Sequence, residues 1–136
     1  MRKGRKAAIV IVIVLLVGFL LFKLVAGRIV SHAAALPVRE MDFSGLEDGT
    51  NTGSCEIFPV RVVVQTEVQN GKLTKIDLLE HFNGRGSAAE KIVDDILAGQ
   101  SLQVDNIAGA TVSSVAIRKA VEDALSGNEV RQSVAQ

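Results

Sequence analysis

The fold is decided by the stretch VRVVVQTEVQNGKLTKIDLLEHF, residues 60–82. Its first half, Val60–Val68, alternates two sets of residues, one of them apolar almost throughout, which is the pattern of a strand with one buried face. Asn70-Gly71 interrupts this pattern, and a second apolar-rich run follows from Lys72 to Phe82. An Asn-Gly pair between two such runs predicts a β-hairpin.

The register of this hairpin depends on the length of its loop. A two-residue loop, Asn70-Gly71, would set Val64 against Asp77. A three-residue loop, residues 69–71 with the glycine in the left-handed conformation, sets Val64 against Ile76 instead. Because a slip of one residue moves every side chain to the other face, we expect the loop that pairs apolar residues, which is the three-residue one.

Two helices are expected after the hairpin. Ser87-Ala88-Ala89-Glu90 has the pattern of a capping box, and Gly99 is expected to end this helix in the left-handed conformation. The last helix is expected over residues 112–126, with Gly127 stopping it. An earlier strand is expected around residues 50–57. The predicted fold class is therefore α+β, a small antiparallel sheet with helices packed on one face.

The N-terminal segment predicts one transmembrane helix before this domain. Residues 7–22 are sixteen consecutive residues without a charge, and the apolar span reaches Ala26 if Lys23 extends its stem toward the headgroups. The alternative is a cleaved signal peptide, since Ala33-Ala34-Ala35 has suitable small residues. The apolar stretch is longer than a signal peptide needs, and Lys23 and Arg28 lie where a neutral cleavage region is expected, so we favour the anchor.

The charges are divided between the two parts of the chain. Residues 1–26 hold five bases and no acid, whereas residues 27–136 hold ten bases and fifteen acids. The positive-inside rule therefore predicts a cytoplasmic N-terminus and a C-terminal domain outside the cell membrane. The acidic balance of that domain argues against binding to nucleic acid. One cysteine and two distant histidines predict neither a disulfide framework nor a metal site.

The predicted organisation has four parts. They are a basic stub with the transmembrane helix (1–26), a stalk linker (27–45), an extracytoplasmic domain (46–127) and a polar, frayed tail (128–136). Outside the hairpin and the helices, Cys55 is expected to be a small buried residue.

The chemistry is expected in the segment DNIAGATVSS, residues 105–114, which leads into the last helix. Ala108, Gly109 and Ala110 leave the backbone open, while Thr111, Ser113 and Ser114 bring hydroxyls to the helix N-terminus. The free N–H groups and partial positive charge of that end favour a phosphate. The alternative, which the spacing alone favours because capping hydroxyls are common, is that Thr111 or Ser113 only caps the helix.

This segment resembles the signature of the covalent FMN-binding domain family. The upstream segments DGTNTG (48–53), NGK (70–72), LEH (79–81) and QS (100–101) are similar to that family's in the same order, so the resemblance covers about residues 46–125. Two positions depart from the family: Ala108 stands where Ser or Thr is most frequent, and Asn51 replaces an aromatic residue.

The resemblance implies that Thr111 carries FMN through a phosphoester on its hydroxyl. A separate flavin transferase would attach it with FAD as the donor, recognising Asp105 and the residues 108–111. A side chain at position 109 would obstruct that enzyme's approach. The expected cofactor-binding residues are, besides Thr111, Asp105, Ala108, Gly109, Ala110, Val112, Ser113 and Ser114. Phe58 and Phe82 either flank the flavin or, as we favour, pack in the core.

The function implied is that of a membrane-anchored electron-transfer flavoprotein, a carrier more than a stand-alone enzyme. The chain resembles the FMN-bearing subunits of the sodium-translocating NADH:quinone oxidoreductase and of the ferredoxin-linked ion-translocating membrane complex. Its electron partners would be a membrane redox complex, a quinone or another flavoprotein. Two alternatives stay open: a flavin-free anchored interaction module of the same fold, and a non-covalent FMN binder.

Overall fold

The computed structural model describes the backbone of residues 2–82 and 86–134, and side chains within residues 6–82 and 87–127. The chain forms two compact units, residues 1–32 and 33–136. Each unit is described by itself.

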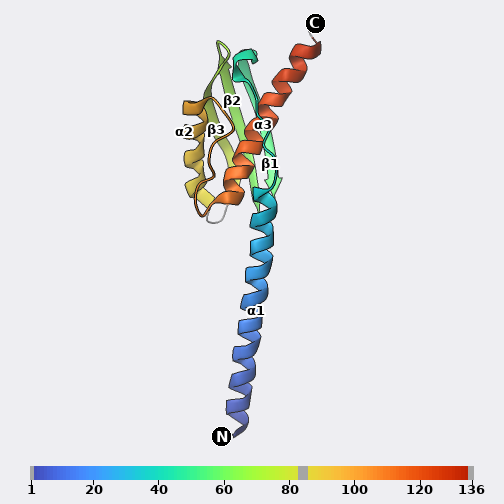
Figure 1. Ribbon diagram of the computed structural model, residues 1–136, viewed down its shortest axis with the longest axis vertical. Coiled ribbons are helices and arrows are strands. Elements are labelled where there is room, and N and C mark those ends of the chain that lie inside the picture. The colour runs from blue at the N-terminus through green and yellow to red at the C-terminus, as the bar shows by residue number, and fades with distance from the viewer. Residues whose placement is uncertain (1, 83–85, 135–136) are drawn as a thin grey trace. The chain divides into compact units, whose positions relative to one another are not determined.

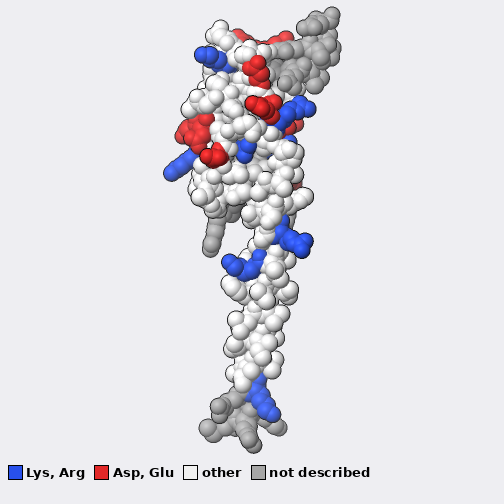
Figure 2. All heavy atoms as spheres, viewed as in Figure 1, with Lys and Arg blue, Asp and Glu red and all other residues white. Residues whose placement is uncertain are grey.

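The first unit consists of most of α1 (Arg2–Ala34), a helix that continues eight residues beyond the expected end of the span at Ala26. From Lys6 to Ala34 it is long and apolar enough to cross a membrane. Its large apolar side chains between Ile9 and Val25 are all more than half exposed. Figure 2 shows a long stretch without charged side chains, with basic residues toward both ends of the helix. The predicted N-terminal helix that could span a membrane is therefore present.

The second unit is an α+β domain, as predicted. Three antiparallel strands, β1 (Gly49–Ile57), β2 (Val60–Gln69) and β3 (Lys72–Phe82), form one sheet in the order β1-β2-β3. Two α-helices follow, α2 (Ile92–Gly99) and α3 (Thr111–Val134), and both lie on the same face of the sheet (Figure 1). Short 3-10 helices cover Phe43–Gly45 and Gly86–Lys91.

The core lies between the sheet and α3. Every second residue of β2, from Val60 to Val68, is buried, which confirms the face predicted from the alternation. The side of α3 that faces the sheet is apolar, and all of it is buried: Ile117, Ala120, Val121, Ala124 and Leu125. The strand predicted around residues 50–57 is β1.

The predicted three-residue hairpin loop is wrong. Gln69 pairs with Lys72, so the loop is the two-residue Asn70-Gly71, and both of its residues have positive φ (53° and 68°), as a type I′ turn requires. A β-bulge directly after the turn then shifts the register by one residue. Val64 consequently faces Leu78, neither Asp77 nor Ile76. The local Asn-Gly preference determines the loop, and the bulge restores the apolar pairing.

The predicted helix ends also need correction. Residues 86–91 form a 3-10 helix in place of a capping box, and Glu90 contacts His81. The left-handed residue that ends α2 is Gln100 (φ 47°), not Gly99. Gly127 does not stop α3, because a single glycine costs a helix only about 1 kcal/mol. The segment expected to be a frayed tail is helical as far as Val134, and residues 135–136 lie outside the described residues.

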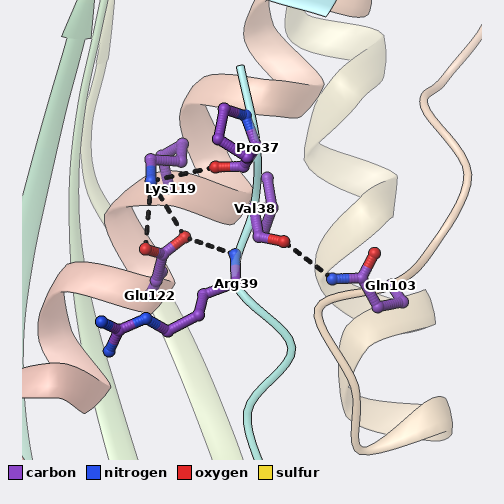
Figure 3. A network of polar contacts seen from close by, with 6 residues as sticks. All are labelled: Pro37, Val38, Arg39, Gln103, Lys119 and Glu122. Carbon is purple, nitrogen blue, oxygen red and sulfur yellow. Dashed lines mark hydrogen bonds and ion pairs between the residues drawn. The ribbon is translucent and has the colours of Figure 1, made fainter. Parts of the chain in front are cut away.

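Part of the expected stalk belongs to the core of the second unit, since Met41 and Phe43 are buried. The segment 37–39 is held by its backbone (Figure 3). Lys119 donates to the carbonyl of Pro37 (3.2 Å), Gln103 donates to that of Val38 (2.9 Å), and the N–H of Arg39 donates to Glu122 (3.0 Å). These are three side chains from α3 and from the loop before it. The chain leading into the domain is thus fastened to the helix that carries the candidate site.

Gly53 determines how close α3 comes to β1. A Cβ at this position would overlap the carbonyl oxygen of Ala120 and the backbone nitrogen of Ala124. One residue further along β1, the N–H of Ser54 donates to the Asp123 carboxylate on α3 (2.9 Å). The helix backbone therefore lies directly against the strand, which is possible only where the strand has no side chain.

We predict that Gly53→Ala destabilises the domain by about 3 kcal/mol, because the added methyl group meets backbone atoms that can move only with the whole helix. Urea unfolding of the detergent-solubilised chain, followed by circular dichroism, measures this change. Gly99→Ala is the matched control, because its Cβ meets nothing within 4 Å. Its effect should stay within about 0.5 kcal/mol. Equal stability of the two variants would contradict the close approach.

The Cys55 thiol provides a pH-dependent probe of the same β1–α3 interface. Burial raises its pKa, the nearby Lys119 opposes that rise, and Asp123 and Glu122 add to it. We predict that alkylation of the native chain by iodoacetamide reaches half its maximal rate at a higher pH than alkylation of the urea-unfolded chain. Because the folded pKa is raised, stability should fall as pH rises through the pKa of the unfolded thiol. Cys55 is the chain's one cysteine, so the rate reports this site alone; identical pH midpoints would contradict the prediction.

Candidate functional site

The candidate site is the loop between α2 and α3, residues 100–110, together with the first turn of α3. The start of the loop is fixed by Gln100, whose side-chain amide forms hydrogen bonds with the backbone of β3 at Leu73. The amide oxygen accepts from the N–H of Leu73 (3.0 Å), and the amide nitrogen donates to the carbonyls of Leu73 and Leu97 (both 2.8 Å). These three bonds offset the cost of the left-handed backbone at Gln100 and tie the end of α2 to the sheet.

The middle of the loop is held by Arg118 of α3. Its Nε donates to the carbonyl of Leu102 (2.8 Å) and its Nη1 to the side-chain oxygen of Asn106 (3.1 Å). Leu102 is fully buried and anchors this part of the loop in the core. Burial lowers the pKa of the Arg118 guanidinium, and the neighbouring Asp105 carboxylate opposes that shift. Arg118 thus holds the middle of the loop against α3.

The end of the loop is a tight turn over residues 107–110. The N–H of Ala110 donates to the carbonyl of Ile107 (3.0 Å), and Gly109 has a φ of 78°. A positive φ at the third residue is what a type II turn requires, and glycine adopts it without strain. A Cβ built on Gly109 meets nothing within 4 Å. Within the chain, backbone conformation and not lack of space therefore requires glycine here.

Ser114 fastens both ends of this turn. The N–H of Ile107 donates to its Oγ (3.0 Å), and its hydroxyl donates to the carbonyl of Ala110 (2.9 Å). The Ser114 side chain is completely buried.

The first turn of α3 excludes a capping role for Thr111 and Ser113. The carbonyl of Ala110 accepts the hydrogen bond from the N–H of Ser114 (2.9 Å), so Ala110 is the N-cap residue and Thr111 the first residue of the helix. Alanine has no side-chain acceptor for the free N–H groups of the first turn. Within the described part of the chain, the hydroxyl of the half-buried Thr111 makes no hydrogen bond.

The structure divides the predicted cofactor-binding residues into two groups. Asp105, Ala108 and Gly109 are exposed, and Thr111 and Val112 are half-buried; Ala110, Ser113 and Ser114 are buried. Their contact with a cofactor stays a prediction. The three exposed residues and Thr111 all lie within residues 105–111, where the chain reaches the protein surface, whereas the buried group faces inward.

Two aromatic residues that we expected in the core lie at the surface. Phe58 and Phe82 are 78% and 68% exposed, so the expectation that they pack in the core is wrong. They belong to the β1–β2 turn and to the last position of β3, at the end of the sheet where α3 begins (Figure 1). Next to Phe82, the side chain of His81 is nearly buried and its Nδ1 lies 3.1 Å from Glu90. Among the described residues, no group of three or more His, Cys, Asp or Glu side chains could hold a metal ion.

Sequence reasoning missed the supporting roles of Gln100 and Arg118. Their partners are backbone atoms, apart from Asn106, and backbone acceptors have no sequence pattern of their own. The one signal available was the spacing of Ser114 and Arg118, which are four apart and therefore lie on the same face of the helix.

In a comparison with known families, the chain matches the FMN-binding domain over residues 58–126. No curated protein matches the chain. The matched segment begins at the β1–β2 turn, contains β2, β3 and α2, and ends in α3, so it includes the whole candidate site. It covers just over half of the 136 residues and confirms the predicted resemblance. The chain therefore belongs to the FMN-binding domain family and is a flavin-binding protein.

Proposed function

We propose that this protein carries FMN in a phosphoester bond to the hydroxyl of Thr111 and passes electrons at the outer face of the cell membrane. The observation that carries the proposal is the position and hydrogen bonding of the Thr111 hydroxyl. It lies at the start of a helix, it is partly exposed, and it makes no hydrogen bond within the described residues. A threonine that served only as a cap would occupy the position of Ala110 and would bond to the backbone.

The surroundings of Thr111 fit a phosphate group. The first N–H groups of a helix have no partner within the helix, and the aligned peptide dipoles give this end a partial positive charge. With alanine as the N-cap residue, no side chain from that position competes for these donors. A phosphodiester on Thr111 would bring oxygens to the same donors, as phosphates bound at helix N-termini do.

Attachment requires a second enzyme, a flavin transferase, with FAD as the donor. The Thr111 oxygen attacks the phosphorus on the FMN side of the FAD pyrophosphate, the bond to AMP breaks, and AMP leaves. The hydroxyl proton passes to a base of the transferase. Asp105, Ala108 and Gly109 are exposed beside the acceptor, which supports their recognition by that enzyme.

Covalent attachment suits a domain outside the membrane. The occupancy of a non-covalent site falls with the concentration of free ligand, and a covalent bond removes that dependence. The five bases and absence of acids in residues 1–26 support a single-pass anchor with a cytoplasmic N-terminus and an extracytoplasmic C-terminal domain. FMN supplies one- and two-electron transfer when bound, and the protein supplies its placement. The partners of such a carrier would be a membrane redox complex, a quinone or another flavoprotein.

We predict that co-expression with a flavin transferase adds the mass of one FMN, less one water, to the intact chain. Thr111→Ala should abolish the adduct, because no other hydroxyl of the segment has the same position at the first residue of the helix. Ser113→Ala is the matched control and should keep the adduct, since that neighbouring hydroxyl is 3% exposed. Mass spectrometry of the denatured chain measures both.

The same experiment separates the alternatives. Flavin that copurifies with the chain and is lost on denaturation would indicate a non-covalent FMN binder. A chain that is colourless and unmodified both after co-expression and when isolated from its own cells would indicate a flavin-free interaction module. An adduct that persists in Thr111→Ala would show that FMN is attached to another residue.

A second prediction concerns Gly109. If backbone conformation is the requirement, Gly109→Asn should be modified faster than Gly109→Ala, because Asn tolerates positive φ and Ala does not. A difference of about 1 kcal/mol in turn stability corresponds to about a fivefold difference in initial rate. The reverse order, with the smaller alanine faster than asparagine, would indicate that the transferase needs space at this position. Initial rates of adduct formation with purified transferase and FAD measure the order.

A further inference from the structure

We propose that Ser114 is a positioning residue for flavin attachment: its hydroxyl clamps both ends of the turn that presents Thr111 to the transferase. The inference rests on the proposed attachment of FMN to Thr111. It assigns Ser114 a role in forming the modified protein, in place of the direct cofactor contact expected from its position in the segment.

The geometry of Ser114 carries the proposal. A serine hydroxyl has one donor and two acceptor sites. Here the donor reaches the carbonyl of Ala110 (2.9 Å), the last residue of the turn, and one acceptor site takes the N–H of Ile107 (3.0 Å), the first. The side chain is fully buried and cannot contact a ligand in solvent without leaving both bonds.

The turn depends on this clamp because it has little else to hold it. Its own backbone hydrogen bond runs from the N–H of Ala110 to the carbonyl of Ile107 (3.0 Å). Gly109 allows the required positive φ, but glycine allows many other conformations as well. Without the Ser114 hydroxyl, the N–H of Ile107 loses its acceptor and the first residue of the turn is no longer hydrogen-bonded to α3, so the fraction of molecules with the correct loop falls.

Arg118, one helical turn further along α3, extends the same support. It holds Leu102 and Asn106, while Ser114 holds Ile107 and Ala110. The loop before the acceptor is therefore attached at both its middle and its end to one face of the helix whose first residue is the acceptor. Loop and acceptor form one body that the transferase can bind without first ordering it.

The consequence for the reaction follows from the population of the competent loop. When only a fraction of the acceptor protein has the correct conformation, its apparent binding constant is weakened by that fraction. Once the transferase has bound and ordered the loop, the chemical step on Thr111 is unchanged. Loss of the clamp should therefore raise the KM for the acceptor protein and leave kcat nearly constant.

The test uses the full-length chain in detergent micelles with a purified flavin transferase, FAD and Mg²⁺. Initial rates of AMP release are measured over a range of acceptor concentrations for wild type, Ser114→Ala, Ser114→Thr and Ser126→Ala. We expect KM to rise about tenfold in Ser114→Ala, the effect of losing roughly one net hydrogen bond, with kcat within about twofold of wild type. Ser114→Thr keeps the hydroxyl and should restore a low KM.

Two controls separate positioning from general damage. Ser126→Ala removes a serine hydroxyl from the same helix, twelve residues after Ser114 and outside the candidate site, and it should behave as wild type. Hydrogen exchange should be faster at the amide of Ile107 in Ser114→Ala, while the amides of β2 and of α3 beyond its first turn keep their protection. General destabilisation of the domain would instead lower the protection of amides throughout the sheet. It would not raise KM while leaving kcat unchanged.

The outcomes are distinct. A wild-type KM in Ser114→Ala overturns the proposal, and so does a loss confined to kcat. If Ser114→Ala does not fold, Ser114→Thr decides: a low KM supports the clamp and a KM raised about tenfold overturns it. No AMP release with the wild-type chain would contradict the function proposed for Thr111, which is a different failure from equal rates in all four chains.

Discussion

The structure depends on the direct contact between the backbone of α3 and the backbone of β1 at Gly53. A side chain there would overlap Ala120 and Ala124, and the helix would have to move away from the sheet. Because α3 carries Thr111 as its first residue, the position of α3 on the sheet sets the position of the proposed FMN acceptor. The preceding loop is attached to α3 through Ser114 and Arg118, so it follows the helix. The absence of a side chain at Gly53 thus determines where Thr111 lies.

The hairpin shows how far local sequence rules predict this fold. Asn70-Gly71 favours a two-residue loop, whereas the apolar pattern requires an apolar partner for Val64. Both preferences are met in a third register, because a bulge after the turn shifts the pairing so that Val64 faces Leu78. Periodicity correctly gave the strands, the buried faces and the order of elements. It could not give the bulge, because an inserted residue is decided by packing across the sheet and not by either strand alone.

The candidate site likewise has a part that the sequence predicts and a part that it does not. The segment around Thr111 is continuous in sequence, so its composition could point to it. The residues that hold it, Gln100 and Arg118, bind mostly backbone atoms far away in the chain, and a carbonyl of Leu73 or Leu102 looks like any other in a sequence. Glu90 shows the same limit. The sequence predicts a capping box with the nearby Ser87, but folding brings His81 within hydrogen-bond distance of Glu90. Local partners are visible in sequence, and long-range partners are not.

The N-cap of α3 is where the chain departs from the ordinary rules of helix design. Ser, Thr, Asp or Asn at that position typically stabilises a helix by about 1 kcal/mol over alanine, yet Ala110 stands there with a threonine directly after it. With the two residues exchanged, the threonine would be the N-cap residue. Its hydroxyl would then accept a hydrogen bond from a backbone N–H of the first turn. The observed order leaves the N–H groups of the first turn without a side-chain partner from the N-cap and leaves the Thr111 hydroxyl unbonded within the described residues. A phosphoester at Thr111 would supply oxygens to those donors, so the modification would complete the cap that the sequence omits.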